Sequence, residues 1–330
     1  MPSKKPVIAV VGGAGYIGSH TAKLLFEKGF SPVIIDNFST GHHDFIQWGT
    51  FYTCCLSDQE SLTSLLKKIN PVAVFHFAAS INVSESVIDP ELYYHNNVNG
   101  TLNLLSSMRK ADISNLIFSS TAAVYGHPES NLILESHPCR PINPYGQSKY
   151  MMEHIIKDFH EAYGLNYIIF RYFNAAGADH DHLIGEDHSP ETHLIPNILM
   201  AASGVKPTLT VFGNNYDTPD GTCIRDYIHV SDLALAHVLG LNYLLDAKQS
   251  HCMNLGTSQG LSILELIKHA EIITRTSIAY TFYERRSGDP PILVADASFA
   301  QSLLDWEPQH SSIDTILNTS WKWFQSRFHV

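Results

Sequence analysis

The sequence predicts an α/β protein in which a doubly wound parallel sheet is joined to a smaller C-terminal α/β lobe. Short runs rich in β-branched residues alternate with segments of helical periodicity through the first half of the chain. The first run ends in a cluster of glycines, and a polar stretch over residues 177–192 interrupts the alternation. We therefore expect a sheet domain over residues 1–175, joined by returning segments from the C-terminal half, and a second lobe over residues 176–330.

Composition and charge exclude several classes of protein. The chain has 330 residues, 44% of them hydrophobic, so it can bury a large core. A net charge of −11 without a basic block argues against a nucleic-acid partner. No segment resembles a signal peptide or a membrane span, so we expect no membrane partner. The five cysteines are odd in number and lack metal-ligand spacing, which indicates free thiols and a cytoplasmic protein.

The first strand and its turn have the pattern of a dinucleotide-binding unit. Residues 7–11 form a continuous apolar run, typical of a buried parallel strand. The run ends in Gly12-x-x-Gly15-x-x-Gly18, and residues 19–28 then have helical spacing. Glycines let the backbone approach a pyrophosphate, and the helix N-terminus offers unpaired N–H groups to it. Strand, turn and helix together predict a Rossmann fold with a bound dinucleotide.

Asp36 indicates which dinucleotide is bound. It ends the next predicted strand, residues 32–35. An acid at this position hydrogen-bonds the ribose hydroxyls of the adenosine and repels a 2′-phosphate. No Arg follows closely, so the sequence favours NAD over NADP.

The alternation of strands and helices then continues. Strands are predicted over 72–77, 116–118 and 167–170, and helices over 97–108 and 145–163. Ligands of such sheets bind at the carboxyl ends of the strands. The residues at these ends are Asp36, Phe77, Thr121 and the segment 171–174.

Tyr145 and Lys149 form the candidate catalytic pair. Four residues apart, they share one face of the predicted helix 145–163. A free tyrosine has a pKa of about 10, and a nearby ammonium favours the phenolate and lowers that pKa. The pair is therefore a candidate proton acceptor for an alcohol or sugar hydroxyl.

The second lobe supplies candidate ligands for an anion. Helices are predicted over 231–245, 262–274 and 313–328. Arg225 precedes the first of these helices, and Arg285 and Arg286 lie between the second and the third. Because a guanidinium presents its donors as a fork, such residues suit a diphosphate group.

Several motifs together resemble a known family. They are Gly12-x-x-Gly15-x-x-Gly18, Asn96-Asn97-Val98-Asn99-Gly100-Thr101, Ser119-Ser120-Thr121, Tyr145-x-x-x-Lys149, Arg171-Tyr172-Phe173-Asn174, Arg225-Asp226-Tyr227-Ile228-His229 and Arg285-Arg286-x-Gly288-Asp289. In this order the chain resembles the extended short-chain dehydrogenase/reductases, and among them the UDP-glucose 4-epimerases of galactose metabolism. The resemblance implies an isomerase that inverts C4 of a UDP-hexose through a transient 4-keto sugar, with tightly bound NAD.

The resemblance also implies roles for single residues. Thr121 and Tyr145 would hold the 4-hydroxyl, with Tyr145 the base, and Lys149 would bind the nicotinamide ribose. Implied cofactor contacts are Gly12, Gly15, Tyr16, Ile17, Gly18, Asp36, Asn37, Cys55, Leu56, Phe77, Ala78, Ala79, Asn96, Tyr145, Lys149 and Phe173. Implied substrate contacts are Thr121, Tyr145, Asn174, His193, Leu194, Thr210, Val211, Phe212, Arg225, Arg286, Asp289 and Leu293.

Three positions depart from the family pattern. Cys54-Cys55 stands where many members have Gly-Asp to meet the adenine, and a thiol is a weak partner for an amine. Ile81 replaces a Lys that contacts the cofactor in some members. Leu293 replaces a Tyr that limits the space near the sugar, which leads to the hypothesis that an N-acetylated hexosamine also fits.

Other interpretations remain beside this one. A nucleotide-sugar dehydratase needs an acid and a base after Thr121, where this chain has Ala122-Ala123. A non-catalytic dinucleotide sensor shares the fold, but such proteins have usually lost the Tyr or the Lys. The acids and histidines of the loop, including His180, His182, His188 and His193, fit no standard ligand spacing, so we expect no metal. Wide apolar faces on helices 97–110 and 145–163 predict a homodimer.

Overall fold

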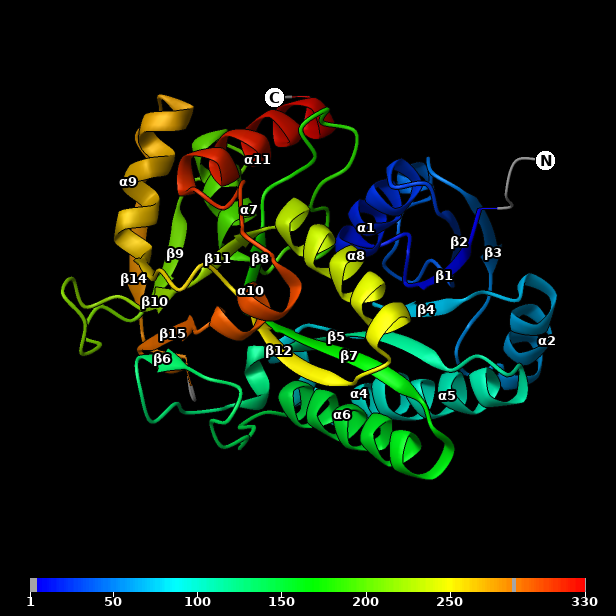
Figure 1. Cartoon of the computed structure of the whole chain (residues 1–330). Coiled ribbons are helices and arrows are strands. Elements are labelled where there is room, and N and C mark those ends of the chain that lie inside the picture. The colour runs from blue at the N-terminus through cyan, green and yellow to red at the C-terminus, as the bar shows by residue number, and fades with distance from the viewer. Residues whose placement is uncertain (1–4, 287–288, 330) are drawn as a thin grey trace. The chain divides into compact units, whose positions relative to one another are not determined.

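The structure is a computed structural model that describes residues 5–286 and 289–329. Gly288 of the Arg285-Arg286-x-Gly288-Asp289 motif lies outside the described residues. The chain forms two compact units (Figure 1). The first unit contains residues 1–124, 141–171 and 234–253, and the second contains residues 125–140, 172–233 and 254–330.

The first unit is built on a seven-stranded sheet, which confirms the predicted doubly wound α/β fold. Its strand order is β12-β7-β5-β4-β1-β2-β3. The pairs β1·β2, β2·β3, β1·β4 and β4·β5 are parallel. The strand order reverses between β1 and β4, where sheets of this kind bind ligands. The strands are β1 (Val7–Val11), β2 (Ser31–Asp36), β3 (Thr50–Thr53), β4 (Ala73–His76), β5 (Asn115–Thr121), β7 (Asn166–Tyr172) and β12 (His251–Leu255).

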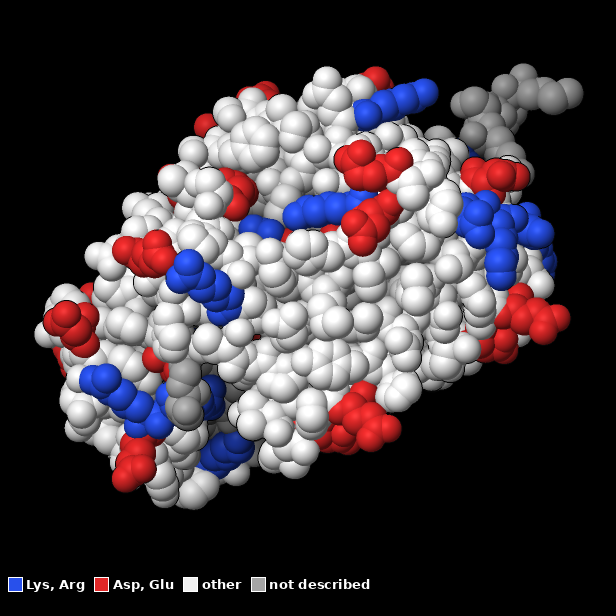
Figure 2. Space-filling view, turned by 90° about the horizontal axis from the view of Figure 1, so that it is seen from below, with Lys and Arg blue, Asp and Glu red and all other residues white. Residues whose placement is uncertain are grey.

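Helices of the first unit pack against this sheet and against one another. They are α1 (Tyr16–Glu27), α2 (Gln59–Ile69), α3 (Val83–Ile88), α4 (Pro90–Tyr93), the π-helix η2 (Tyr94–Asn99), α5 (Gly100–Lys110), α6 (Pro144–Tyr163) and α8 (Val230–Ala247). The face seen in Figure 2, on the side where α5 and α6 lie in Figure 1, carries few charged side chains over its centre.

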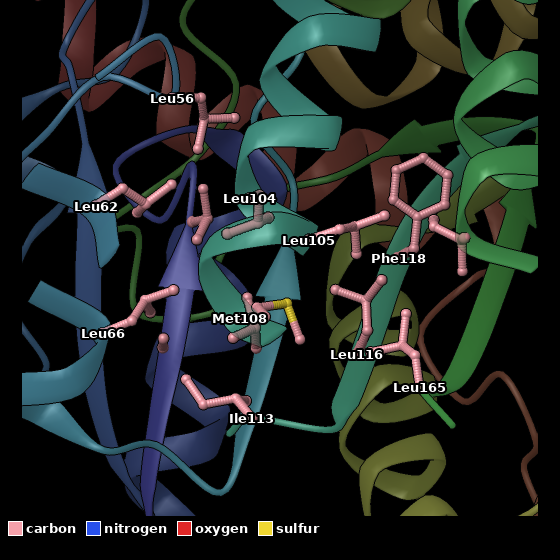
Figure 3. Close-up of a cluster of buried hydrophobic side chains, with 14 of the residues drawn as sticks. Leu56, Leu62, Leu66, Leu104, Leu105, Met108, Ile113, Leu116, Phe118 and Leu165 are labelled. Atoms are coloured by element: carbon pink, nitrogen blue, oxygen red, sulfur yellow. The ribbon is translucent and has the colours of Figure 1, made fainter. Parts of the chain in front are cut away.

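The core of the first unit explains why these elements form. Leu104, Leu105 and Met108 recur at helical spacing on α5 and are 0–1% exposed. They pack with Leu116 and Phe118 of β5 in one buried cluster (Figure 3). A single face of α5 therefore holds that helix against the sheet.

Some elements differ from the prediction. Helix α1 begins at Tyr16, three residues before the predicted start, because glycine supplies its N-cap at Gly15. Strand β3 and helix α2 were not predicted, although Asp58 caps α2 by accepting from the N–H of Ser61. Strand β3 has a largely exposed burial pattern, so it lacks the apolar run of a buried strand.

The second unit has three small sheets and four helices among its described residues. The sheets are β13-β10-β15-β6, β11-β8 and β14-β9. Their strands are β6 (Leu132–Ile133), β8 (Asn174–Ala176), β9 (Leu209–Phe212), β10 (Ile224–Arg225), β11 (Tyr227–His229), β13 (Leu261–Ser262), β14 (Tyr280–Tyr283) and β15 (Ile292–Ala295). Its helices are α7 (Leu194–Ala202), α9 (Ile263–Thr274), α10 (Ser298–Leu304) and α11 (Ile313–Phe328).

Side chains of α7, α9 and α11 share the core of the second unit. Ile198, Leu266 and Ile316 are each fully buried there. Over the described part of the chain, no helix has the length and apolar character needed to cross a membrane.

Candidate functional site

The glycine turn between β1 and α1 is shaped for close backbone approach. A Cβ on Gly12, whose φ is +78°, would lie 2.5 Å from the backbone N of Ala78. A Cβ on Gly18 would lie 2.2 Å from the Gly12 carbonyl oxygen. Side chains at either position would break the turn. Helix α1 starts at Tyr16 and Ile17 with no acid in its first turn, so its N-terminal N–H groups suit an anion such as a pyrophosphate.

Asp36 links β2 to this turn. Its Oδ2 accepts a hydrogen bond from the N–H of Ala14 at 3.0 Å, and its Oδ1 accepts from the N–H of Phe38 at 2.9 Å. The carboxylate is 9% exposed. It therefore holds the turn in place at the carboxyl end of β2, where the sequence predicted contact with the adenosine ribose.

The cysteine pair lies beside Asp36. The N–H of Cys54 donates to the Asp36 carbonyl oxygen at 3.0 Å. Asn37 Nδ2 donates to Cys55 Sγ at 3.7 Å, and Ser57 Oγ donates to the same sulfur at 3.0 Å. The bond from Ser57 is the main reason that the pKa of Cys55 is lowered. Asn37 and Cys55 are thus neighbours at the ends of β2 and β3.

The segment after β4 contacts the glycine turn and η2. The N–H groups of Phe77 and Ala78 both donate to the Val11 carbonyl oxygen, at 2.8 and 3.2 Å. Asn96 Nδ2 donates to Ser80 Oγ at 3.0 Å. The glycine turn, Asp36 and this segment thus lie together at the carboxyl ends of β1, β2 and β4, where sheets of this kind bind a dinucleotide.

Helix α6 brings Tyr145 and Lys149 to the end of β5. Asn143 caps the helix by accepting from the N–H of Gly146 at 2.8 Å. A Cβ on Gly146 would lie only 2.6 Å from the Ala123 carbonyl oxygen. The Tyr145 phenol lies near the Thr121 hydroxyl, which lowers the phenol's pKa against the larger effect of burial. The structure therefore brings Tyr145 and Thr121 together.

Lys149 is buried behind Tyr145. It is 2% exposed, and its Nζ donates to the Ser119 carbonyl oxygen at 2.9 Å. Desolvation lowers the pKa of Lys149 to about 7, against the opposing effect of the Glu153 carboxylate.

The expected lowering of the Tyr145 pKa is not found. Desolvation raises the pKa of Tyr145, and the Thr121 hydroxyl offsets part of that rise. The prediction of the direction was wrong, because it counted the ammonium and left out the burial of the phenol.

Buried polar residues that support this site were not predicted. Glu153, which is 0% exposed, accepts from Ser120 Oγ at 2.5 Å and from Arg171 Nε at 2.9 Å. Asn97 donates to Ser148 Oγ at 3.0 Å. The motifs 96–101, 119–121 and 171–174 contained three of these residues, but only the structure shows that they hold α6 against the sheet.

In the second unit, Arg225 and Asp289 form an ion pair through Nη2 and Oδ1. Strands β10 and β15 place Arg225 opposite Leu293. The N–H of Asn174 donates to the Asp226 carbonyl oxygen at 3.1 Å. Four residues predicted to contact the substrate therefore lie on or beside β10: Asn174, Arg225, Asp289 and Leu293. The Asp289 carboxylate partly balances the charge of Arg225.

Arg286 and the predicted residues of β9 form a second group. The guanidinium of Arg286 lies 4.1 Å from the ring centroid of Phe212, over its face. Thr210 and Val211 precede Phe212 on the same strand. The N–H of Asp289 donates to the Arg286 carbonyl oxygen at 3.2 Å, which connects this group to Arg225.

His193 and Leu194 lie at the start of α7. His193 is the N-cap residue, and its Nδ1 is hydrogen-bonded to Glu186 Oε1. Desolvation lowers the pKa of His193, but the Glu186 carboxylate outweighs it and raises the value to about 9. The imidazole is therefore a cation at neutral pH.

The predicted residues fall into both units. The residues predicted to contact the pyrophosphate and the ribose of the cofactor, and the predicted catalytic base Tyr145, lie within the first unit. The predicted uridine-diphosphate contacts, together with Phe173, belong to the second unit. The histidines of the loop fall into two groups. The ring nitrogens of His180 and His310 lie 3.2 Å apart, whereas His188 and His193 both contact Glu186.

Comparison with known proteins gives consistent results. A family model described as NAD dependent epimerase/dehydratase family matches residues 8–256. UDP-glucose 4-epimerase of Rhizobium meliloti is 48% identical over 320 residues, covering 97% of this chain and 97% of that protein.

Solved structures agree in fold along the chain. The UDP-glucose 4-epimerase of Brucella ovis in complex with NAD has a TM-score of 0.95 and 50% identity, covering 97% of this chain and 98% of that chain. The UDP-Glc/GlcNAc 4-epimerase of Campylobacter jejuni has a TM-score of 0.86 and 37% identity, covering 97% and 99%. This chain belongs to the NAD dependent epimerase/dehydratase family.

Proposed function

We propose that this protein is an NAD-dependent isomerase that interconverts UDP-glucose and UDP-galactose by epimerisation at C4. The observation that carries the proposal is the group at the end of β5. Tyr145 lies near Thr121, and the buried Lys149, one helical turn away, donates to the Ser119 carbonyl oxygen at 2.9 Å. Relatives at 48–50% identity carry the same activity in their names.

In the proposed mechanism, Thr121 and Tyr145 bind the 4-hydroxyl of the sugar and Tyr145 removes its proton. NAD, held by the glycine turn and Asp36, would supply the chemistry that the side chains lack, which is reversible hydride transfer at C4. A positive ring next to the phenol would also lower the raised pKa of Tyr145. Lys149 holds the ribose and adds a second positive charge.

Inversion requires that the sugar turn while the nucleotide stays in place. Arg225 and Arg286 are the cations of the second unit that we assign to the uridine diphosphate, and His193 is a further contact at the start of α7. Because these residues hold only the nucleotide, the sugar would be free to turn about its link to the diphosphate and present the other face of C4. Tyr145 then returns the proton.

The test is conversion of UDP-galactose by the purified protein, followed by NMR with no second substrate. We expect UDP-glucose to appear. Tyr145→Phe should reduce turnover by at least about 100-fold, the usual contribution of a general base. Tyr163→Phe is the matched control, since it removes an exposed hydroxyl from the same helix. Equal activity of the two variants would contradict the role of Tyr145.

We also propose that N-acetylated UDP-hexosamines are substrates. Leu293 lies opposite Arg225 in the register of β10 and β15, where a larger residue would occupy space beside the assigned diphosphate contacts. The Campylobacter jejuni relative is named for both substrate types. We expect turnover of UDP-N-acetylgalactosamine, and Leu293→Tyr should reduce it more than turnover of UDP-galactose. No turnover of the first substrate by the wild type would refute the proposal.

We propose that two copies of the chain form a homodimer through α3, α4, α5 and α6. Large apolar side chains are exposed on these helices, including Val87 at 64% and Ile88 at 85%. Figure 2 shows few charged side chains over the face on which α5 and α6 lie. An apolar surface of this kind marks an interaction site.

We also propose a reducing, cytoplasmic location. Within the described residues the five cysteines form no disulfide. Such thiols persist in a reducing compartment.

A further inference from the structure

The loop between β8 and α7 brings together four side chains that the proposed function does not use as a group. They are Glu186, His188, Glu191 and His193, and each offers one ligand atom within 4.8 Å of the others. Glu186 is 9% exposed, and the side chain of Glu191 is 3% exposed. Two nearly buried carboxylates therefore face two imidazoles, of which His188 is 20% and His193 46% exposed.

The ligand atoms of the cluster lie in direct contact with one another. His188 Nδ1 lies 3.4 Å from Glu186 Oε1 and 3.8 Å from Glu191 Oε2. His193 Nδ1 contacts the same Glu186 oxygen. The other oxygen of Glu191 accepts the backbone N–H groups of Thr192 and His193, each at 2.7 Å. Those two bonds fix the Glu191 carboxylate and leave Oε2 turned toward His188.

The loop is anchored from both sides of the cluster. Trp323 Nε1 donates to the Glu186 carbonyl oxygen at 3.0 Å, and Arg327 Nε donates to Asp187 Oδ2 at 2.8 Å. At the other end, Asn197 Nδ2 donates to the His193 carbonyl oxygen at 2.7 Å. Helices α11 and α7 thus hold the backbone of the loop that carries these four residues.

We propose that Glu186, His188, Glu191 and His193 bind a divalent transition-metal ion, with Zn²⁺ the best match. Two imidazole nitrogens and two carboxylate oxygens are a four-coordinate donor set suited to zinc. The two carboxylates balance the charge of the ion. Zinc bonds of about 2.0–2.2 Å put tetrahedral ligand atoms about 3.3 Å apart, so the widest separation must contract by roughly 1.5 Å.

The alternative is a network of ion pairs without a metal. In that case the positive charge between the carboxylates comes from protonated imidazoles, and no cation binds with one-to-one stoichiometry. Magnesium discriminates poorly between these cases, because it prefers six oxygen ligands and keeps its waters. A transition-metal titration distinguishes them.

The experiment is calorimetric titration of chelator-treated full-length protein with zinc chloride. We expect one ion per chain, with a dissociation constant below about 10 µM. His188→Gln and Glu191→Gln should each weaken binding at least about tenfold. His269→Gln is the matched control, because it removes an imidazole paired with a carboxylate, Asp314, at 3.0 Å outside the cluster. It should leave the affinity unchanged.

A second measurement needs no variant and covers the case in which the substitutions prevent folding. X-ray absorption of the zinc-loaded wild type should show two imidazole ligands and oxygen donors. Sulfur ligands, an all-oxygen shell, or zinc binding that His188→Gln leaves intact would overturn the assignment. None of these measurements uses a nucleotide sugar, so their outcome is independent of the proposed epimerase activity.

Discussion

At the scale of single residues, Glu153 is the buried charge on which α6 depends most directly. It accepts hydrogen bonds from Arg171 Nε at 2.9 Å and Nη2 at 2.5 Å, and Arg171 is itself 3% exposed. Neither charge has water to solvate it, so each requires the other.

We therefore expect Glu153→Gln to lower the free energy of unfolding by about 3–5 kcal/mol, because it leaves the Arg171 cation buried without its counter-charge. Urea unfolding at neutral pH measures this. Glu161→Gln, at an exposed position of the same helix, should change stability by less than about 0.5 kcal/mol. A similar small effect for both would mean that the ion pair is replaceable.

Lys149 predicts a pH dependence of stability in protein freed of NAD. Its pKa is about 7 in the folded chain, against about 10.4 when unfolded. Between these values the unfolded chain binds the extra proton, so the free energy of unfolding rises with pH. The cost of burying the ammonium is full below about pH 7 and is gone above about pH 10.4.

Wild type should accordingly gain stability relative to Lys149→Met by on the order of a few kcal/mol between pH 7 and 10. Urea unfolding at several pH values would measure this difference in the free energy of unfolding between wild type and Lys149→Met. Lys110→Met, at an exposed position of α5, is the control, and its free energy of unfolding should have the same pH dependence as that of the wild type. A pH-independent difference for Lys149→Met would contradict the assigned shift.

At the scale of elements, a helix or strand was predicted well where residues within it or at its ends mark its structure. Helix α6 was predicted almost residue for residue, because Asn143, Pro144 and Gly164 mark its ends locally. The strand ends carrying Asp36 and Thr121 were also located, since buried strands have continuous apolar runs. The loop cluster at Glu186 was not predictable, because a loop has no period that brings distant side chains together.

Gly146 sets the distance between α6 and the segment after β5. A glycine-to-alanine change in a helix normally stabilises by about 0.5–1 kcal/mol. Here the new Cβ would lie 2.6 Å from a backbone oxygen, so we expect Gly146→Ala to destabilise by about 1–3 kcal/mol and to reduce epimerase turnover. Gly100→Ala, whose Cβ would meet only the Leu56 side chain at 3.3 Å, is the control for stability and should be nearly neutral.

At the scale of the whole molecule, the proposed dimer can be tested by charge. Val87 and Ile88 are among the most exposed apolar side chains in the described chain. Ile88→Asp should convert a dimer into monomers of 36.8 kDa, because a carboxylate would be desolvated in the interface. Light scattering at micromolar concentration measures the mass. Ile272→Asp, exposed by 73% on α9, should remain dimeric, and a monomeric wild type would refute the dimer.

The route of the chain between its two units has a consequence for synthesis on the ribosome. The first unit takes most of α8 and β12 from residues 234–253, after the chain has entered the second unit for the second time at residue 172. At about 5–20 residues per second, several seconds pass before these residues emerge. Until then β7 lacks its neighbour β12, and the nascent protein must keep an open sheet edge from pairing with other chains.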